Sequence, residues 1–264
     1  RNGKNWNGLQ SRGRLSSSST LWRASSCPTR TVSEETLKVQ KKKIAELESF
    51  VVEGKDKGPV VVLCHGFGAN AQDLLPLAEA LSAPAGTTWI FPDAPIEFPI
   101  GPGMKGRAWF PLVAEEIARL AATGKHLNFY EVVPPGLEAS RKKLEALIHE
   151  TGRPANLITL GGFSQGSMLA VDTYLHASET MAGLVIMSGN LICRDQWTRL
   201  APARRGSQFI QSHGLMDPVL PYENAKRLET VLREGGLSGE FISFSGGHEI
   251  PQGVIKKVSL YLTR

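Results

Sequence analysis

The chain has 264 residues, of which 41% are apolar, and a formal net charge of +5. This length can bury one sizeable core, and α/β folds of this size often form a single domain. No apolar run approaches the length of a membrane span. The three cysteines, Cys27, Cys64 and Cys193, are widely separated and odd in number, which argues against a disulfide framework and favours a reducing compartment.

The basic excess belongs to the first part of the chain. Residues 1–33 contain six Lys or Arg residues and no acidic residue, which leaves 24 basic and 25 acidic residues for the rest. Because this remainder is close to neutral, its charge does not support nucleic-acid binding by a folded domain. The leader is rich in serine and lacks an apolar core, which is typical of an organellar transit peptide or of a disordered tail. The expected location is therefore the cytoplasm, or an organelle if the leader is a transit peptide.

Folded structure is expected from residue 49. Residues 34–48 are charged and predict a short helix or a linker, so the leader and linker span 1–48 and the folded domain spans 49–264. Within the domain, apolar strand-like runs alternate with helical segments, as in parallel β-α-β units. The expected strands are Val60–Cys64, Thr88–Phe91, Leu157–Leu160, Leu184–Met187, Gln208–Gln211 and Phe241–Phe244. The expected helices are Ala71–Leu81, Val113–Ala122, Gly136–His149, Gln165–Ala177, Tyr222–Glu234 and Pro251–Leu262.

A Gly-x-Ser-x-Gly pentapeptide lies between one of these strands and the next helix. It runs from Gly162 to Gly166 with Ser164 at its centre. A serine on such a tight strand-to-helix turn holds its hydroxyl above the sheet, and a side chain at either glycine would collide with a neighbouring strand or helix. This context predicts a nucleophile elbow and acyl transfer through Ser164.

A serine nucleophile needs a base, and the base needs a group that orients it. In this type of fold the chain order is serine, carboxylate, histidine. Asp217 follows the strand that begins at Gln208, and His248 follows the strand that ends at Phe244. Asp217 precedes a proline and could also begin an ordinary turn. His248 follows two glycines, which let the backbone bend freely and leave the imidazole at a loop tip.

The other five histidines are assigned to structural roles. His65 and His213 each precede a glycine directly after a strand, where we expect hydrogen bonds that shape a loop. Histidines in or beside helical segments are expected to be satisfied structural residues, and these are His126, His149 and His176.

Acyl transfer also requires hydrogen-bond donors for the oxyanion. The backbone N–H of Gln165 follows the nucleophile, and the positive end of the helix that begins there would stabilise the developing charge. The second donor is expected in the loop after the first parallel strand, where glycines flank Phe67 and let the backbone amides turn inward. The alternative for this loop is a tight turn without a catalytic role.

These motifs together resemble the phospholipase/carboxylesterase branch of the α/β-hydrolases. The matching segments are His65–Gly68, Phe91–Pro95, Arg107–Phe110, Gly162–Gly166, His213–Val219 and Gly246–His248. The resemblance implies an α/β-hydrolase fold, a Ser164–Asp217–His248 triad, and an oxyanion hole from Phe67 and Gln165. It also implies that residues 49–264 are a catalytic domain without a cofactor. The substrates of the family include short carboxylic esters, lysophospholipids and S-acylated proteins.

The sequence departs from the family at the residue after Trp109-Phe110. Pro111 stands where acyl-protein thioesterases carry an aspartate, which weakens that specific assignment. The first expectation is therefore a carboxylesterase, with a thioesterase or lysophospholipase as the alternative and a catalytically silent binding protein as a further one. The segment from Pro99 to Tyr130 is expected to cover the site, with Trp109 either near the substrate or packing this segment against the body.

A Gly-x-Gly-x-x-Gly pattern at Gly101–Gly106 has the wrong context for a dinucleotide-binding loop. It contains a proline and leads into Trp109 rather than opening a helix. We interpret it as a flexible cover loop. No spacing of Cys, His or carboxylate residues predicts a metal site.

Overall fold

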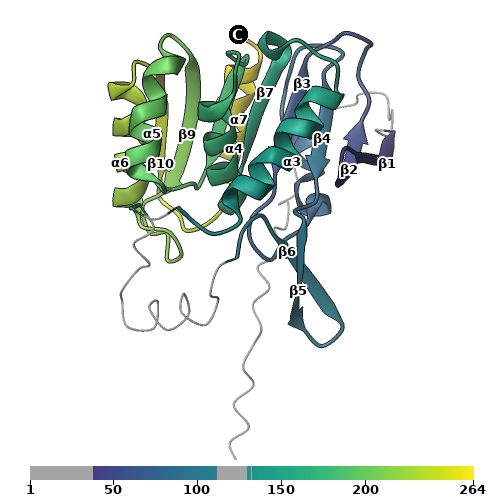
Figure 1. Ribbon diagram of the computed structural model, residues 1–264, viewed down its shortest axis with the longest axis horizontal. Coiled ribbons are helices and arrows are strands. Elements are labelled where there is room, and N and C mark those ends of the chain that lie inside the picture. The colour runs from purple at the N-terminus through teal and green to yellow at the C-terminus, as the bar shows by residue number, and fades with distance from the viewer. Residues whose placement is uncertain (1–37, 112–129, 132) are drawn as a thin grey trace, which may run out of the picture. The chain divides into compact units, whose positions relative to one another are not determined.

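The structure is a computed structural model and describes residues 38–111, 130–131 and 133–264. Its centre is an eight-stranded sheet in the spatial order β1-β2-β4-β3-β7-β8-β9-β10 (Figure 1). Strands β1, β2 and β4 pair antiparallel, and the neighbours from β4 to β10 pair parallel. The strands are β1 Val39–Ile44, β2 Leu47–Val52, β3 Val60–Cys64, β4 Thr88–Pro92, β7 Ile158–Phe163, β8 Gly183–Met187, β9 Gln208–Gly214 and β10 Ser238–Phe244.

Helices cover both faces of the sheet and create two apolar cores. In Figure 1, α3 to α6 lie in front of the sheet and α7 lies behind it. Alternate residues of β3 serve the two cores, with Val60 and Val62 on the first face and Val61 and Leu63 on the second. The first face carries α3 Leu137–Glu150, α4 Gln165–His176, α5 Arg194–Leu200 and α6 Tyr222–Glu234. The second carries η1 Ala71–Leu74, α1 Leu77–Ala80 and α7 Gln252–Leu262. The remaining 3-10 helices are η2 Ala155–Leu157 and η3 Ala201–Arg204.

The predicted α/β architecture is confirmed, and all six predicted strands are present. The predicted helix at 71–81 is divided instead, because a 3-10 turn ends before Pro76 and a short helix follows it. The helix α5 was not predicted. The helix predicted at 113–122 lies outside the described residues, as does most of the expected cover segment after residue 111.

Regular structure begins ten residues before the predicted boundary at 49. Strand β1, expected to be part of a helix or linker, pairs with β2 from Val39↔Val52 to Ile44↔Leu47. Its three lysines, Lys41–Lys43, are exposed on an edge strand, where charge discourages further pairing. A lysine-rich run therefore forms a strand here because of its antiparallel partner.

The Gly101–Gly106 segment is part of a β-hairpin rather than a flexible loop. Strand β5, Ile96–Gly101, pairs antiparallel with β6, Met104–Ala108, and the turn passes through Gly103 at φ 70°. The hairpin begins four residues after β4, at the carboxyl ends of the parallel strands, and extends from the lower edge of the sheet in Figure 1. This arrangement places it beside the loops that carry the candidate site.

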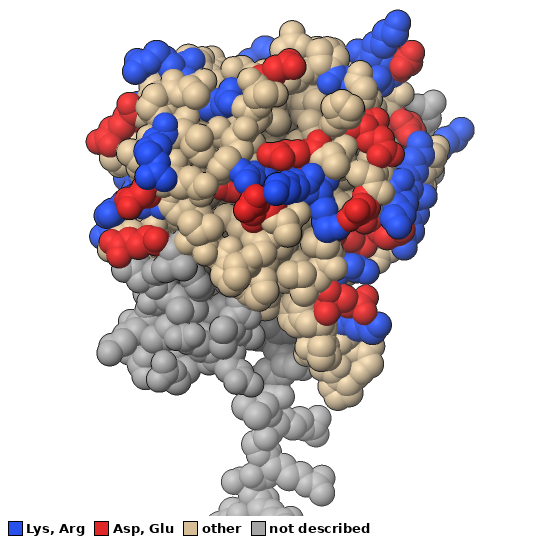
Figure 2. All heavy atoms as spheres, in the orientation of Figure 1, with Lys and Arg blue, Asp and Glu red and all other residues tan. Residues whose placement is uncertain are grey.

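Charges of both signs are mixed on the face shown in Figure 2. On α3, for example, Lys142 lies 2.8 Å from Glu138, and Arg141 lies 3.9 Å from Glu145. The end of the hairpin in this view lacks charged atoms, and its Ile100 and Met104 are about half exposed. Within the described ranges, no helix is long and apolar enough to cross a membrane.

Candidate active site

Ser164 lies at the turn between β7 and α4, as the Gly-x-Ser-x-Gly motif predicts. Its backbone has φ 53° and ψ −121°, a conformation that costs a non-glycine residue energy and that concentrates at functional sites. The Ser164 N–H donates to the Met187 carbonyl on the adjacent strand β8 at 2.9 Å. The residue keeps 9% of its surface exposed, in a surrounding that is otherwise buried. The strand end and the helix start thus hold this serine at the edge of the sheet.

The two glycines of the motif are required by close backbone contacts. A Cβ at Gly162 would lie 2.6 Å from the carbonyl oxygen of Cys64, and a Cβ at Gly166 would lie 2.2 Å from the same atom. Both distances are far below a normal van der Waals contact. The first turn of α4 can therefore approach the end of β3 only without side chains at these positions, which is the reason proposed from the sequence.

Asp217 and His248 come from the loops after β9 and β10 and are hydrogen-bonded to each other. His248 Nδ1–H donates to Asp217 Oδ2 at 2.7 Å. The other carboxylate oxygen, Oδ1, accepts the N–H groups of Val219 and Leu220 at 2.8 and 2.9 Å. Burial alone would raise the pKa of Asp217, but the His248 contact and these two amides lower it below its ordinary value. The carboxylate is therefore anionic and fixes one nitrogen of the ring.

Backbone contacts bring these two loops together. Met216 N–H donates to the Gly246 carbonyl at 3.0 Å, and Leu215 N–H donates to the Phe244 carbonyl at 2.9 Å. A Cβ at Gly214 would lie 2.2 Å from the Gly247 carbonyl oxygen, so the close approach requires glycine. The acid and the imidazole are consequently held side by side.

His248 also contacts the residue before the serine. Its ring centroid lies 4.8 Å from that of Phe163, at an angle of 46°. Among the described residues, no hydrogen bond joins Ser164 Oγ to His248. The structure therefore brings the acid and the histidine into direct contact, and it places the ring beside the elbow.

The two candidate oxyanion donors lie on neighbouring loops. Gln165 is the first residue of α4, where a backbone N–H has no acceptor within its own helix. Phe67 lies in the loop that directly follows β3, and β3 pairs with β7, which carries the serine at its end. Hence both donors belong to the carboxyl ends of adjacent parallel strands.

His65 and His213 form the loop-shaping hydrogen bonds that were predicted. His65 Nδ1–H donates to the Gly66 carbonyl at 2.7 Å, while its Nε2 accepts the Ala94 N–H at 3.0 Å. His213 Nε2–H donates to the Leu220 carbonyl at 3.0 Å. Burial is the largest influence on both rings and lowers the pKa of each, which favours neutral imidazoles.

Trp109 was predicted either to lie near the substrate or to pack the cover segment against the body. Its side chain is fully buried, and its indole Nε1–H donates to the His65 carbonyl at 2.8 Å. Its backbone N–H donates to Gln165 Oε1 at 2.9 Å, and its carbonyl accepts from the Ser140 hydroxyl. The alternative prediction, packing of this segment against the body, agrees with these contacts.

Neither the Gln165 side chain nor the Arg107 guanidinium was assigned a role from the sequence. Each joins segments that are distant in sequence, and a single sequence carries no signal for such contacts. In the part of the chain that the structure describes, no group of three or more His, Cys, Asp or Glu residues is placed to hold a metal ion.

The parallel sheet, the serine elbow and the Asp217–His248 pair at its carboxyl edge define an α/β-hydrolase. The chain belongs to the phospholipase/carboxylesterase family, whose sequence model matches residues 46–264. The resemblance inferred from the motifs is thereby confirmed, and by this membership the protein is an ester hydrolase.

Individual relatives agree with this assignment. An acyl-protein thioesterase 1 of Emericella nidulans is 28% identical over 191 residues, which cover 67% of this chain and 77% of the relative. A probable carboxylesterase of Oryza sativa subsp. japonica is 28% identical over 199 residues, which cover 72% of this chain and 71% of the relative. The crystal structure of a carboxylesterase from Mesorhizobium loti superposes with a TM-score of 0.66 at 16% identity, over 85% of this chain and 98% of that one. At this identity the superposition supports the fold alone.

Proposed function

We propose that the protein hydrolyses carboxylic esters through an acyl-enzyme on Ser164, with His248 as the base and Asp217 as the residue that orients it. The observation that carries the proposal is the 2.7 Å hydrogen bond between His248 Nδ1 and Asp217 Oδ2, in a loop pair beside the strained serine elbow. A donated Nδ1–H leaves the lone pair of Nε2 free to accept the serine proton. This tautomer is the one that a general base requires.

The chemical steps follow from where the proton moves. Neutral His248 removes the proton of Ser164 as the hydroxyl oxygen attacks the acyl carbon, and Asp217 stabilises the resulting imidazolium. The N–H groups of Phe67 and Gln165 donate to the oxyanion, each contributing about 3 to 4 kcal/mol in a dry site. His248 then gives the proton to the leaving alcohol. Water repeats the sequence and releases the acid, so no cofactor enters the scheme.

Exposed apolar side chains beside Asp217 favour an acyl ester as substrate. Leu215 and Met216, which precede Asp217, are 51% and 68% exposed. Such side chains can bury a hydrocarbon chain but offer no hydrogen-bond donor or charge to a polar metabolite. The proposed substrates are therefore small-molecule or lipid acyl esters.

A protein thioester is the second candidate substrate. Relatives in Emericella nidulans and Cryptococcus neoformans are named acyl-protein thioesterase 1, the latter 30% identical over 173 residues. The same nucleophile, base and oxyanion donors can act on a thioester, because only the leaving group differs. Pro111, where acyl-protein thioesterases carry an aspartate, keeps the carboxylester as the first proposal.

Labelling with a fluorophosphonate probe tests the chemistry, and matched substrates test the leaving group. Wild type is expected to form one covalent adduct, and Ser164→Ala is expected to form none. Turnover on p-nitrophenyl esters of two to sixteen carbons gives the acyl preference, and the corresponding thioesters give the ester-to-thioester ratio. A wild-type protein that binds these substrates without a serine-dependent adduct or turnover would instead be the silent binding protein.

We further propose that the basic leader has no part in hydrolysis and is either a transit peptide or a disordered tail. Its six basic residues and its serines agree with a transit peptide or a disordered tail. Strand β1 begins at Val39, so fusion of residues 1–37 to a fluorescent protein tests the first alternative. Uptake into an organelle supports a transit peptide, and a diffuse cytoplasmic signal supports a tail.

A further inference from the structure

We propose that the segment from Arg107 to Phe110, at the carboxyl end of β6, is a positioning element that holds the two oxyanion donors at a constant separation. This inference depends on the proposed function, because it assumes that the Phe67 and Gln165 amides bind an oxyanion. The donors belong to different loops, one after β3 and the other after β7. The two loops contact each other directly near Gly66 and Gly166, and further contacts are needed to fix the separation of the donors.

The first cross-link joins the hairpin to the loop that carries Phe67. Gly68 N–H donates to the Arg107 carbonyl at 2.9 Å, and Arg107 N–H donates to the Ala69 carbonyl at 3.0 Å. This reciprocal pair resembles the bonding of two strands and begins one residue after Phe67. The Phe67 ring also stacks on Phe98 of β5, with centroids 4.8 Å apart. The residue is thus held through its backbone and through its side chain.

The second cross-link runs through Trp109 to both loops. Its indole N–H donates to the carbonyl of His65, two residues before Phe67. Its backbone N–H donates to the Gln165 side-chain oxygen, and Gln165 Nε2–H donates to the Phe110 carbonyl at 2.7 Å. The Gln165 side chain is buried and both ends of its amide are used. One short segment therefore contacts both sides of the oxyanion hole.

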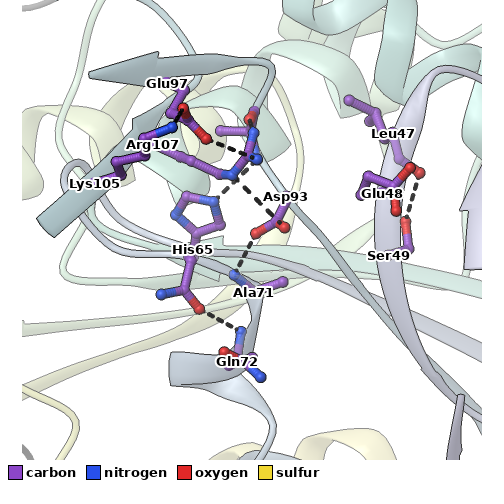
Figure 3. Close-up of polar contacts among 12 residues, drawn as sticks. Leu47, Glu48, Ser49, His65, Ala71, Gln72, Asp93, Glu97, Lys105 and Arg107 are labelled. Atoms are coloured by element: carbon purple, nitrogen blue, oxygen red, sulfur yellow. Dashed lines mark hydrogen bonds and ion pairs between the residues drawn. The ribbon is translucent and has the colours of Figure 1, made fainter. Parts of the chain in front are cut away.

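The Arg107 side chain braces the outer side of the same loop. Figure 3 shows its guanidinium between Asp93 and Glu97. Nη1–H donates to the Ala94 carbonyl at 3.0 Å, and Nε lies 3.7 Å from Asp93 Oδ2. The other oxygen of Asp93 accepts the N–H of Ala71 at 2.8 Å, where the oxyanion loop ends. The loop is consequently tied at both of its ends.

A glycine allows the hairpin to lie this close. A Cβ at Gly106 would lie 2.6 Å from the Gly68 carbonyl oxygen and 2.9 Å from its Cα. Oxyanion donors act by being in place before the charge develops, so a shift of about 1 Å can cost about a hundredfold in rate. A methyl group at Gly106 would displace the loop while leaving every catalytic side chain intact.

Two matched pairs of variants test the positioning role. Gly106→Ala is compared with Gly101→Ala, which adds the same methyl group to the same hairpin where the nearest atom is 3.9 Å away. Trp109→Phe is compared with Trp197→Phe. Trp197 is also fully buried and donates its indole N–H to a carboxylate oxygen of Asp172 at 2.9 Å, but in the described part of the chain no hydrogen bond joins it to the oxyanion loop.

We expect Gly106→Ala and Trp109→Phe to lower kcat about 10- to 100-fold on a p-nitrophenyl ester, with KM within about twofold of wild type. Binding of a trifluoromethyl ketone, whose adduct with serine carries an oxyanion, is expected to weaken by the same factor as kcat/KM. Gly101→Ala and Trp197→Phe are expected to keep kcat within about twofold, even if Trp197→Phe melts at a lower temperature.

Two results would overturn the positioning role but not the proposed function. In the first, wild type is active and Gly106→Ala keeps the wild-type kcat. In the second, Trp109→Phe and Trp197→Phe lose kcat to the same extent, in proportion to their loss of melting temperature. A wild-type protein without turnover or serine labelling would overturn the proposed function, and this inference with it. If Trp109→Phe does not fold, the comparison of the two glycine variants decides the matter.

Discussion

Replacing Asp217 with asparagine changes the proton on the catalytic ring while preserving the shape of the site. In wild type, Oδ1 accepts two backbone N–H groups and Oδ2 accepts the His248 Nδ1–H. An asparagine keeps its single oxygen where the Val219 and Leu220 amides need an acceptor, so its NH2 group must face the ring. His248 Nδ1 then becomes the acceptor and the ring proton moves to Nε2. The nitrogen that should receive the serine proton already carries one.

The expected effect is a loss of about 10⁴-fold in kcat, or about 5.5 kcal/mol in the activation free energy. KM should change little, because Asp217 does not contact the substrate in the proposed scheme. The assay is steady-state hydrolysis of a p-nitrophenyl ester, with the melting temperature measured in parallel as the control for folding. A folded Asp217→Asn protein that retains more than a tenth of the wild-type kcat would refute the assignment of this residue.

Three further predictions concern the elbow, acid stability and the core. Gly166→Ala places a Cβ 2.2 Å from a backbone oxygen, so it should lower the stability by at least about 1–3 kcal/mol and reduce labelling of Ser164 by the fluorophosphonate probe. Unchanged labelling and an unchanged melting temperature would contradict the contact. Burial lowers the pKa of His65 and His213, so at acid pH the unfolded chain binds protons that the folded protein does not bind. The free energy of unfolding should therefore fall as pH drops below about 6.5. Urea titrations at pH 7 and pH 5 can measure this fall, and equal midpoints would contradict it. Leu144→Ala, in a fully buried position on α3, should cost about 2–5 kcal/mol in urea unfolding, whereas the 61% exposed Leu260 should tolerate alanine; equal losses would contradict the assigned burial.

Local patterns in the sequence were sufficient for the six strands of the parallel part of the sheet, β4 to β10 in its spatial order, and for the choice of candidate residues. Strands such as β3 and β8 are continuous apolar runs, as expected for strands covered on both faces. The order of Ser164, Asp217 and His248 after the ends of three predicted parallel strands also predicted that they share one edge. That prediction needs only the rule that parallel strands end on the same side, which is a property of topology and not of any single contact.

Elements that depend on a distant partner were not predictable in the same way. The lysine-rich β1 carries no apolar alternation and exists because β2 supplies its hydrogen bonds. The Gly101–Gly106 segment was expected to be a flexible cover loop, yet only Pro102 and Gly103 form the turn, and Gly106 provides the close approach to Gly68. In each case the residue's neighbour in space decides its conformation.

Trp109 shows the same limit within the candidate site. Its place beside the motif segments made a substrate contact as reasonable as a packing role, because both uses favour an aromatic residue. The two hydrogen bonds that agree with the packing role join it to His65 and Gln165, 44 and 56 residues away along the chain. A tryptophan that only filled space would not need an indole donor, whereas one that fixes a loop does. The indole bond to the His65 carbonyl is the one that requires tryptophan, and substitution by phenylalanine, which keeps an aromatic side chain but removes the donor, separates these two roles.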